Sequence, residues 1–158
     1  MKKLLVFAAV LIFSNEMMAQ KVAHKDVPRY IITAFAEKFP DGKVQKWELK
    51  KEGYTARFNH GGKDLLAYYS HDGKWQGTES KIKWTKHLPE NVKKGWASSG
   101  HYNWYVNGIR SLQTPERQLY VLHINNGSTL DSDHYDAYKE SRVLFFTADG
   151  QLVRTDKI

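Results

Sequence analysis

The chain has 158 residues, of which 41% are hydrophobic and 26% are charged, so it suits one globular domain or two small ones and excludes a large multidomain enzyme. Its formal net charge is +7, which suits acidic partners, although a solvated basic face that aids solubility is the more common case. Because cysteine is absent, disulfide bonds, a thiol nucleophile, a cysteine-ligated metal and a lipidated N-terminal cysteine are all excluded.

The N-terminal segment has the pattern of a secretory signal peptide. Lys2 and Lys3 precede an apolar run over 4–13, and the small residue Ala19 closes the segment. The run is shorter than the about 20 residues that span a bilayer. We therefore predict a signal peptide over 1–19, a periplasmic or secreted protein, and no membrane span.

The next predicted element is an amphipathic helix over 26–38. Apolar residues recur there at spacings of three and four, namely Val27, Tyr30, Ile31, Ala34 and Phe35. Pro28 fits the first turn, where a missing N–H costs nothing. Pro40 and Gly42 end the helix, because proline disfavours helix at the preceding residue and glycine permits a tight turn.

Short runs of branched and aromatic residues follow the helix, at 44–49, 54–58, 65–70 and 75–82. The separators between them each contain glycine, which supplies the positive φ of a hairpin turn. This part of the chain is therefore predicted to be a helix followed by an antiparallel meander.

The same order recurs in the second half. Leu88, Val92 and Trp96 share one face of a shorter predicted helix, and strands are expected at 104–109 and 119–124. The Asp-Gly turn of 72–73 is matched by another at 149–150. We predict an α+β fold of tandem helix-plus-meander repeats, 26–82 and 83–158, whose helices pack on one continuous antiparallel sheet.

The segment over 27–89 carries a recognisable pattern of residues. It comprises Val27-Pro28, Ala34-Phe35, Phe39-Pro40, Val44, Trp47-Glu48, 54–58, 69–75 and Leu88-Pro89. This pattern resembles the β-lactamase-inhibitor-like, PepSY-like secreted proteins of Bacteroidetes. The resemblance implies a fold similar to that of β-lactamase inhibitory protein and a protein-binding or inhibitory role, since PepSY-type domains are associated with restraining peptidases. It implies no catalytic residues and, being a likeness of fold, no inhibition of β-lactamase.

Aromatic residues interleaved with lysines are the most suggestive feature of the middle of the chain. The candidate binding residues are Trp75, Trp84, Tyr102, Trp104 and Tyr105, and the lysines among them are Lys74, Lys81, Lys83, Lys86, Lys93 and Lys94. Such mixtures stack on bases or sugars, or fill the pockets of a protein partner. The plainer alternative is that Trp75, Trp96 and Trp104 pack helices onto the sheet. Trp84 is the aromatic residue most expected to be exposed, and export argues against a nucleic-acid partner.

An acidic stretch in the insertion over 128–140 is the weak candidate for a metal site. Asp131, Asp133 and Asp136 offer oxygen ligands for Ca²⁺, but the glycine and closing glutamate of an EF-hand loop are missing, which favours a solvated loop. His134 with Asp131 or Asp133 would be the acid–base pair of a small hydrolase, although no nucleophile motif surrounds any serine. We predict no cofactor.

The leading hypothesis is an exported non-enzymatic binding module. It would hold another envelope or secreted protein on its concave sheet face, as a peptidase or hydrolase inhibitor or as an adaptor. The alternatives are a small-ligand or glycan-binding envelope protein and the small hydrolase above.

Overall fold

The computed structural model describes residues 20–127 and 140–158. The predicted signal peptide and the acidic candidates Asp131, Asp133 and Asp136, with His134, lie outside the described residues. The chain divides into two compact units, Met1–Thr78 (unit 1) and Glu79–Ile158 (unit 2).

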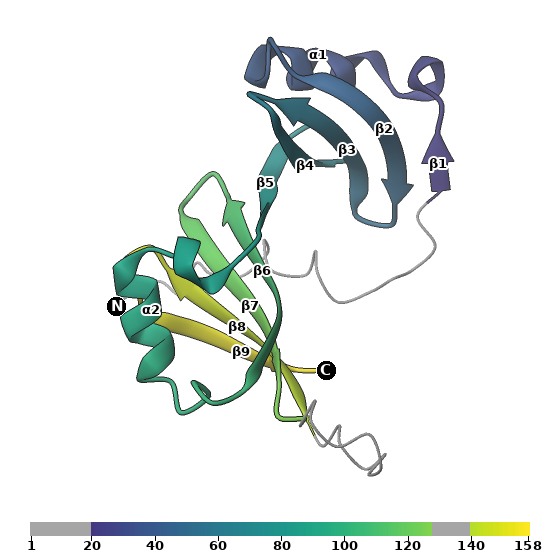
Figure 1. The fold of residues 1–158 in the computed structure, drawn as a ribbon. Helices are drawn as coiled ribbons and strands as arrows, with labels where there is room; N and C mark the ends of the chain where they lie inside the picture. Colours follow the sequence, from purple (N-terminus) through teal and green to yellow (C-terminus); the bar gives the residue numbers. More distant parts are fainter. Residues whose placement is uncertain (1–19, 128–139) are drawn as a thin grey trace, which may run out of the picture. The chain divides into compact units, whose positions relative to one another are not determined.

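Unit 1 consists of a short strand, a 3₁₀ turn, a helix and a meander (Figure 1). These elements are β1 (Gln20–Val22), η2 (His24–Asp26), α1 (Arg29–Lys38), β2 (Lys43–Lys50), β3 (Gly53–His60) and β4 (Lys63–Ser70). The next strand, β5 (Trp75–Ile82), begins in unit 1 and ends in unit 2.

Unit 2 continues with the same kinds of element. They are η3 (Thr85–His87), α2 (Glu90–Ala97), β6 (Tyr105–Gln113), β7 (Gln118–Asn125), β8 (Ser141–Thr147) and β9 (Leu152–Lys157). Within unit 1, strands β1 to β4 pair antiparallel in sequence order, and within unit 2, strands β6 to β9 do the same. Each unit is therefore built on an antiparallel sheet with one α-helix.

Proline positions explain where both helices begin. The helix predicted from residue 26 begins at Arg29, because η2 occupies 24–26 and Pro28 is an extended N-cap with φ −53° and ψ 136°. Pro89 is likewise the N-cap of α2, with φ −56° and ψ 147°. Strand β1 was not predicted, and it is defined by backbone pairing to β2, with Gln20 opposite Leu49.

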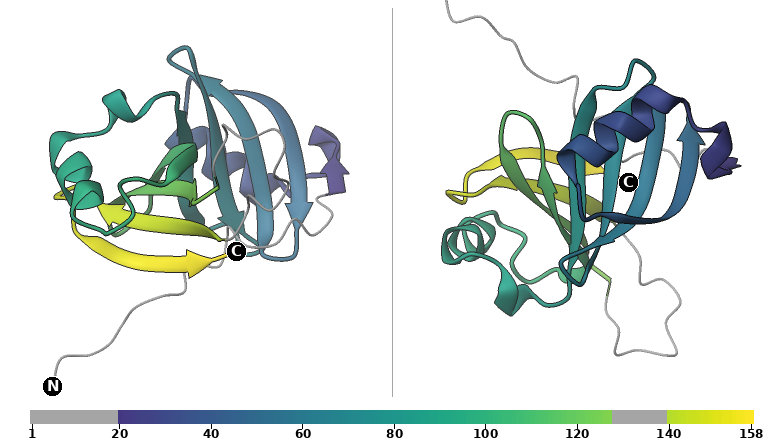
Figure 2. Two further views of the ribbon diagram at one scale, coloured as in Figure 1. Left: turned by 60° about the horizontal axis from the view of Figure 1, so that its bottom comes forward. Right: turned by 90° about the horizontal axis from the view of Figure 1, so that it is seen from above.

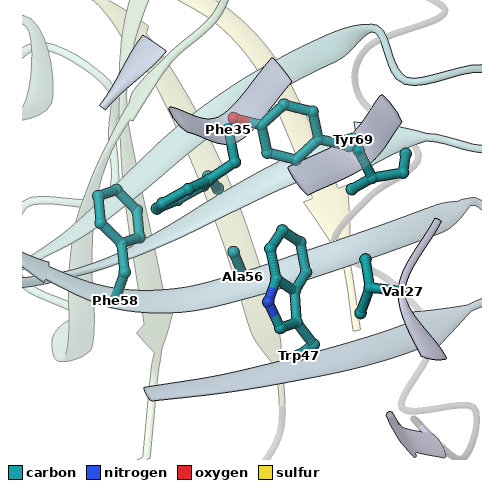
Figure 3. Packing of buried hydrophobic residues seen from close by; sticks show 8 residues of the cluster. Val27, Phe35, Trp47, Ala56, Phe58 and Tyr69 are labelled. Carbon is teal, nitrogen blue, oxygen red and sulfur yellow. The ribbon is translucent and has the colours of Figure 1, made fainter. Parts of the chain in front are cut away.

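The core of unit 1 is largely aromatic (Figure 3). The ring of Phe35 on α1 lies 4.9 Å from that of Phe58 and 5.7 Å from that of Trp47. Ala56 of β3 lies opposite Trp47 of β2, so a small residue adjoins the largest ring in the sheet. Figure 2 shows α1 lying along one face of the strands of its own unit.

The core of unit 2 is mostly aliphatic. Val92 and Trp96 on α2 pack against Leu122, Leu144 and Phe146 of the sheet. Val92 and Trp96 lie one helical turn apart, which places both on the face that meets the strands. One helix therefore covers one sheet face in each unit.

Candidate functional site

An open groove of about 430 Å³ lies beside α2 in unit 2. It is lined by Thr85, Lys86, Lys93, Lys94, Trp96, Ala97 and Tyr102. Two of these residues come from η3, four from α2, and Tyr102 from the segment that follows α2. We call this feature the lysine–aromatic groove.

A turn after α2 brings the two rings of the groove together. Ser99 donates its hydroxyl to the carbonyl of Trp96 at 2.7 Å, and Gly100 has φ +77°, a conformation that glycine adopts readily. The chain thereby returns so that the Tyr102 ring lies 4.9 Å from the Trp96 ring, at 52° to it. Trp96 is 9% exposed whereas Tyr102 is 57% exposed. The groove thus has an inner ring fixed by the core and an outer ring open to solvent.

The lysines make the groove electropositive. Lys93 forms an ion pair with Glu90 at 2.7 Å, and this hydrogen bond and charge lower the pKa of the Glu90 carboxyl. Within 20–127 and 140–158 the ammonium groups of Lys86 and Lys94 form no ion pair or hydrogen bond, and the charge of Lys94 acts on Glu90 only from a distance, where it helps to lower the pKa of that carboxyl. Two of the three cations are therefore available to an anionic ligand.

Two more of the predicted binding residues are exposed. Trp84 immediately precedes η3 and is 55% exposed, with the Lys83 ammonium 5.7 Å from its ring centroid. Tyr105 begins β6 and is 44% exposed. Trp84 adjoins groove residue Thr85 along the chain.

Trp75 and Trp104 instead have packing contacts. The indole N–H of Trp75 donates to the Thr78 hydroxyl at 2.9 Å, and the Lys38 ammonium lies 3.6 Å from its ring centroid in unit 1. Trp104 packs against the core of unit 2, with the His101 ring 4.9 Å and the Arg142 guanidinium 5.4 Å from its own ring.

The groove also contains Trp96, Thr85 and Ala97, which are not among the candidate binding residues predicted from the sequence. The helical spacing of Trp96 correctly places it on the buried face of α2, but a ring at the end of that face also has an exposed edge. The signal that could have identified it is the Ser-Ser-Gly turn at 98–100, which returns an aromatic segment to the end of the helix.

A second, smaller hollow of about 260 Å³ lies at the end of α1 in unit 1. It is lined mainly by apolar side chains, with Ile32, Phe35, Phe39, Val44 and Trp47 among them, and His24 also lines it. The indole Nε1 of Trp47 is buried and has no hydrogen-bond acceptor within the described residues.

A polar cluster lies on the sheet of unit 2. The guanidinium of Arg110 on β6 is 3.3 Å from the carboxylate of Glu79, which is only 5% exposed. His123 on the adjacent β7 is half-buried; its burial, and to a smaller extent the charge of Arg110, lowers the pKa of its imidazole. Within 20–127 and 140–158, no group of three or more histidine and acidic residues could hold a metal ion.

Several solved structures from Bacteroides share this fold. A BLIP-like protein from Bacteroides fragilis is 20% identical, with a TM-score of 0.69, over 83% of this chain and 86% of that one. A DUF2874 family protein from Bacteroides uniformis is 17% identical, with a TM-score of 0.68, over 82% and 88%. A candidate periplasmic protein from Bacteroides eggerthii is 20% identical, with a TM-score of 0.67, over 83% and 88%.

Neither a protein-family profile nor a curated protein matches this chain. In the described part, neither helix has the length and apolar character that crossing a membrane requires. At these identities the structural likeness shows the fold alone, and that fold is BLIP-like.

Proposed function

We propose that this protein is an exported, non-enzymatic binding module that holds another envelope or secreted protein, as an inhibitor or adaptor of a peptidase or other hydrolase. The observation that carries the proposal is the lysine–aromatic groove of unit 2, with the exposed rings of Tyr102 and Trp84. The BLIP-like protein and the candidate periplasmic protein that share the fold support the same class of function and location.

Exposed rings of this kind are typical of protein interfaces. Tryptophan and tyrosine are enriched among the residues that contribute most binding energy, because they bury a large area with few rotatable bonds. Tyr102 is already oriented by its contact with Trp96, so less side-chain freedom is lost on binding. Side chains held in this way are suited to anchor a partner.

The chemistry of the groove favours binding over catalysis. Its lining consists of lysines, two rings, a methyl group and the Thr85 hydroxyl. These lining residues include neither histidine nor a carboxylate, the groups that most often activate a hydroxyl nucleophile.

The test is capture of the partner in the native envelope. The tagged protein would be crosslinked in its own host and the bound proteins identified by mass spectrometry, with Tyr102→Ala and Trp84→Ala compared with the unsubstituted chain. We expect one dominant envelope protein, recovered at least about tenfold less with either variant. Tyr30→Ala, which removes an exposed ring of unit 1, is the matched control and should leave recovery unchanged. Equal recovery with all three variants would contradict this assignment of the surface.

Glycan binding is the second candidate function. An exposed ring beside hydroxyl and ammonium groups, as Tyr102 lies beside Thr85 and Lys86, is a platform on which a sugar ring can stack. A glycan that changes tryptophan fluorescence in the unsubstituted protein but not in the Tyr102→Ala variant would favour this candidate.

A further inference from the structure

We infer that the lysine–aromatic groove recognises an acidic polypeptide segment in which carboxylates flank an apolar or aromatic side chain. This inference rests on the proposed function and specifies the chemistry of the partner's contact segment. It is carried by the two lysines of the groove that have no ion pair, Lys86 and Lys94, and by the two rings that line the groove with them.

The lysines of the groove favour an anionic ligand. Glu90 already neutralises Lys93, and the side chain of Lys93 is 31% exposed. Lys86 and Lys94, which lie on η3 and α2, are the remaining cations of the lining. A carboxylate that meets either one forms a new ion pair without breaking an existing one, so complementarity favours an acidic partner.

The rings of the same lining favour an apolar side chain in the ligand. Trp96 and Tyr102 lie 4.9 Å apart, and Ala97 adds a methyl group to the same lining. A side chain placed there would lose its contact with water and pack against both rings. The groove, at about 430 Å³, is within the size range that takes a small ligand, so it fits a side chain with its flanking backbone.

The lining favours a peptide over an anionic sugar. Thr85 and Tyr102 supply its only neutral side-chain hydroxyls, and no asparagine, glutamine, aspartate or glutamate is among its residues. On entering the groove, the several hydroxyls of a sugar would therefore lose hydrogen bonds to water that the lining does not replace, which weakens binding. An acidic segment with one apolar side chain makes no such demand.

The experiment titrates three capped pentapeptides into the ¹⁵N-labelled, purified exported protein. The probe is Glu-Glu-Leu-Glu-Glu; Gln-Gln-Leu-Gln-Gln removes its charges and Glu-Glu-Ser-Glu-Glu removes its apolar side chain. The indole N–H of Trp96, which is buried and without an acceptor in the described residues, provides an NMR signal at the groove. We expect the probe to shift that signal and the amides of 94–97, and both control peptides to bind at least about tenfold more weakly.

Paired lysine variants test the location. Lys86→Gln with Lys94→Gln should weaken the probe about tenfold, the combined effect of two exposed ion pairs. Lys43→Gln with Lys63→Gln, which removes the same charge from exposed positions of unit 1, should leave its affinity unchanged. The same spectra show whether each variant is folded.

Three outcomes would overturn the inference. They are an unmoved Trp96 signal at millimolar probe, equal binding of all three peptides, and equal weakening by both lysine pairs. Oligogalacturonate that shifts the Trp96 signal where the probe does not would assign the groove to an anionic glycan. If the probe fails while envelope capture still depends on Tyr102, only the peptide chemistry is wrong and the proposed function stands.

Discussion

The two units use the same turn to join their last two strands. In unit 1 the Ser70 N–H donates to the Lys74 carbonyl at 2.9 Å and the Gly73 N–H donates to Ser70 at 3.0 Å. In unit 2 the Thr147 N–H donates to Gln151 at 3.0 Å and the Gly150 N–H donates to Thr147 at 2.9 Å. The hydroxyl that begins each turn also donates to the aspartate two residues later.

The helix meets this common turn in two different ways. A Cβ built on Gly73 would lie 2.9 Å from the ring of Tyr30 on α1, whereas one built on Gly150 would overlap the carbonyl oxygen of Asn91 on α2. A Cβ on Gly95 of α2 would in turn overlap the carbonyl oxygen of Gly150. The turn therefore contacts a side chain in unit 1 and the helix backbone in unit 2. The glycine of the turn should consequently tolerate substitution much better in unit 1 than in unit 2.

The largest expected effect is that of Gly150→Ala. The φ of +89° would be strained by a side chain, and the backbone of α2 would have to move away. We expect a loss of roughly 3 kcal/mol or more in the free energy of unfolding, measured by chemical denaturation.

The matched change in unit 1 is Gly73→Ala. Its φ of +84° carries a similar strain, but the Tyr30 ring, which is exposed, can move aside. We expect a loss of roughly 1–2 kcal/mol. Equal losses from the two substitutions would show that the backbone contact in unit 2 does not matter.

Gly95→Ala tests the same contact from the helix side and reverses an ordinary rule. Within an exposed helix, replacing glycine by alanine stabilises by up to about 1 kcal/mol. Here we expect a loss of roughly 2–3 kcal/mol, because the added methyl group meets the backbone of Gly150. Gly108→Ala is the control, since nothing lies within 4 Å of its added Cβ, and a gain of stability from Gly95→Ala would contradict the close packing of α2.

Sequence reasoning identified both helices and most strands, though not β1, because their apolar periodicity is local. The buried residues Ile31 and Phe35 follow helical spacing, and β5 lies at the predicted 75–82. The close contact between α2 and the turn at Gly150 was not predicted, because in the sequence Gly95 is only a weak helix former. The packing of α2 on this turn depends on contacts between residues that are distant in sequence, and not on the helix or turn propensity of the individual residues.

The sequence predicted which kinds of residue form the candidate site, but not which particular residues line it. The aromatic and lysine-rich middle of the chain does contain the groove, yet its pattern could not separate Tyr102, which is exposed, from Trp104, which packs against the core. Both follow the same turn, but Trp104 packs against the core beside His101 and Arg142, whereas Tyr102 contacts Trp96 at the groove.

A smaller effect is expected from Tyr30→Phe, which removes the side-chain link between α1 and its turn. The hydroxyl donates to the His71 carbonyl at 2.7 Å in an exposed position. We expect a loss of about 0.5–1 kcal/mol by chemical denaturation. A loss as large as that of Gly95→Ala would mean that α1 depends on this contact as much as α2 depends on its backbone contact.

His123 on β7 of unit 2 should make the stability of the protein depend on pH. Because burial and the charge of Arg110 lower the pKa of His123 in the folded protein, the unfolded chain takes up a proton first as the pH falls below the ordinary histidine pKa of 6.5. The free energy of unfolding should therefore be unaffected by His123 above that pH and decrease as the pH falls below it. The decrease should end once the pH is below the pKa of His123 in the folded protein. His123→Gln should flatten this part of a denaturation series from pH 8 to 5.

The acidic groups do not obscure that window. Hydrogen bonds from Lys74 and Ser70 lower the pKa of Asp72 to about 2, and Arg142 lowers the pKa of Glu140. Their contributions are lost only at lower pH, because a carboxyl with a lowered folded pKa stabilises the protein until its unfolded form is protonated. A histidine variant that keeps the full loss between pH 8 and 5 would assign the effect to another group, and a stability that rises on acidification would contradict the burial of His123.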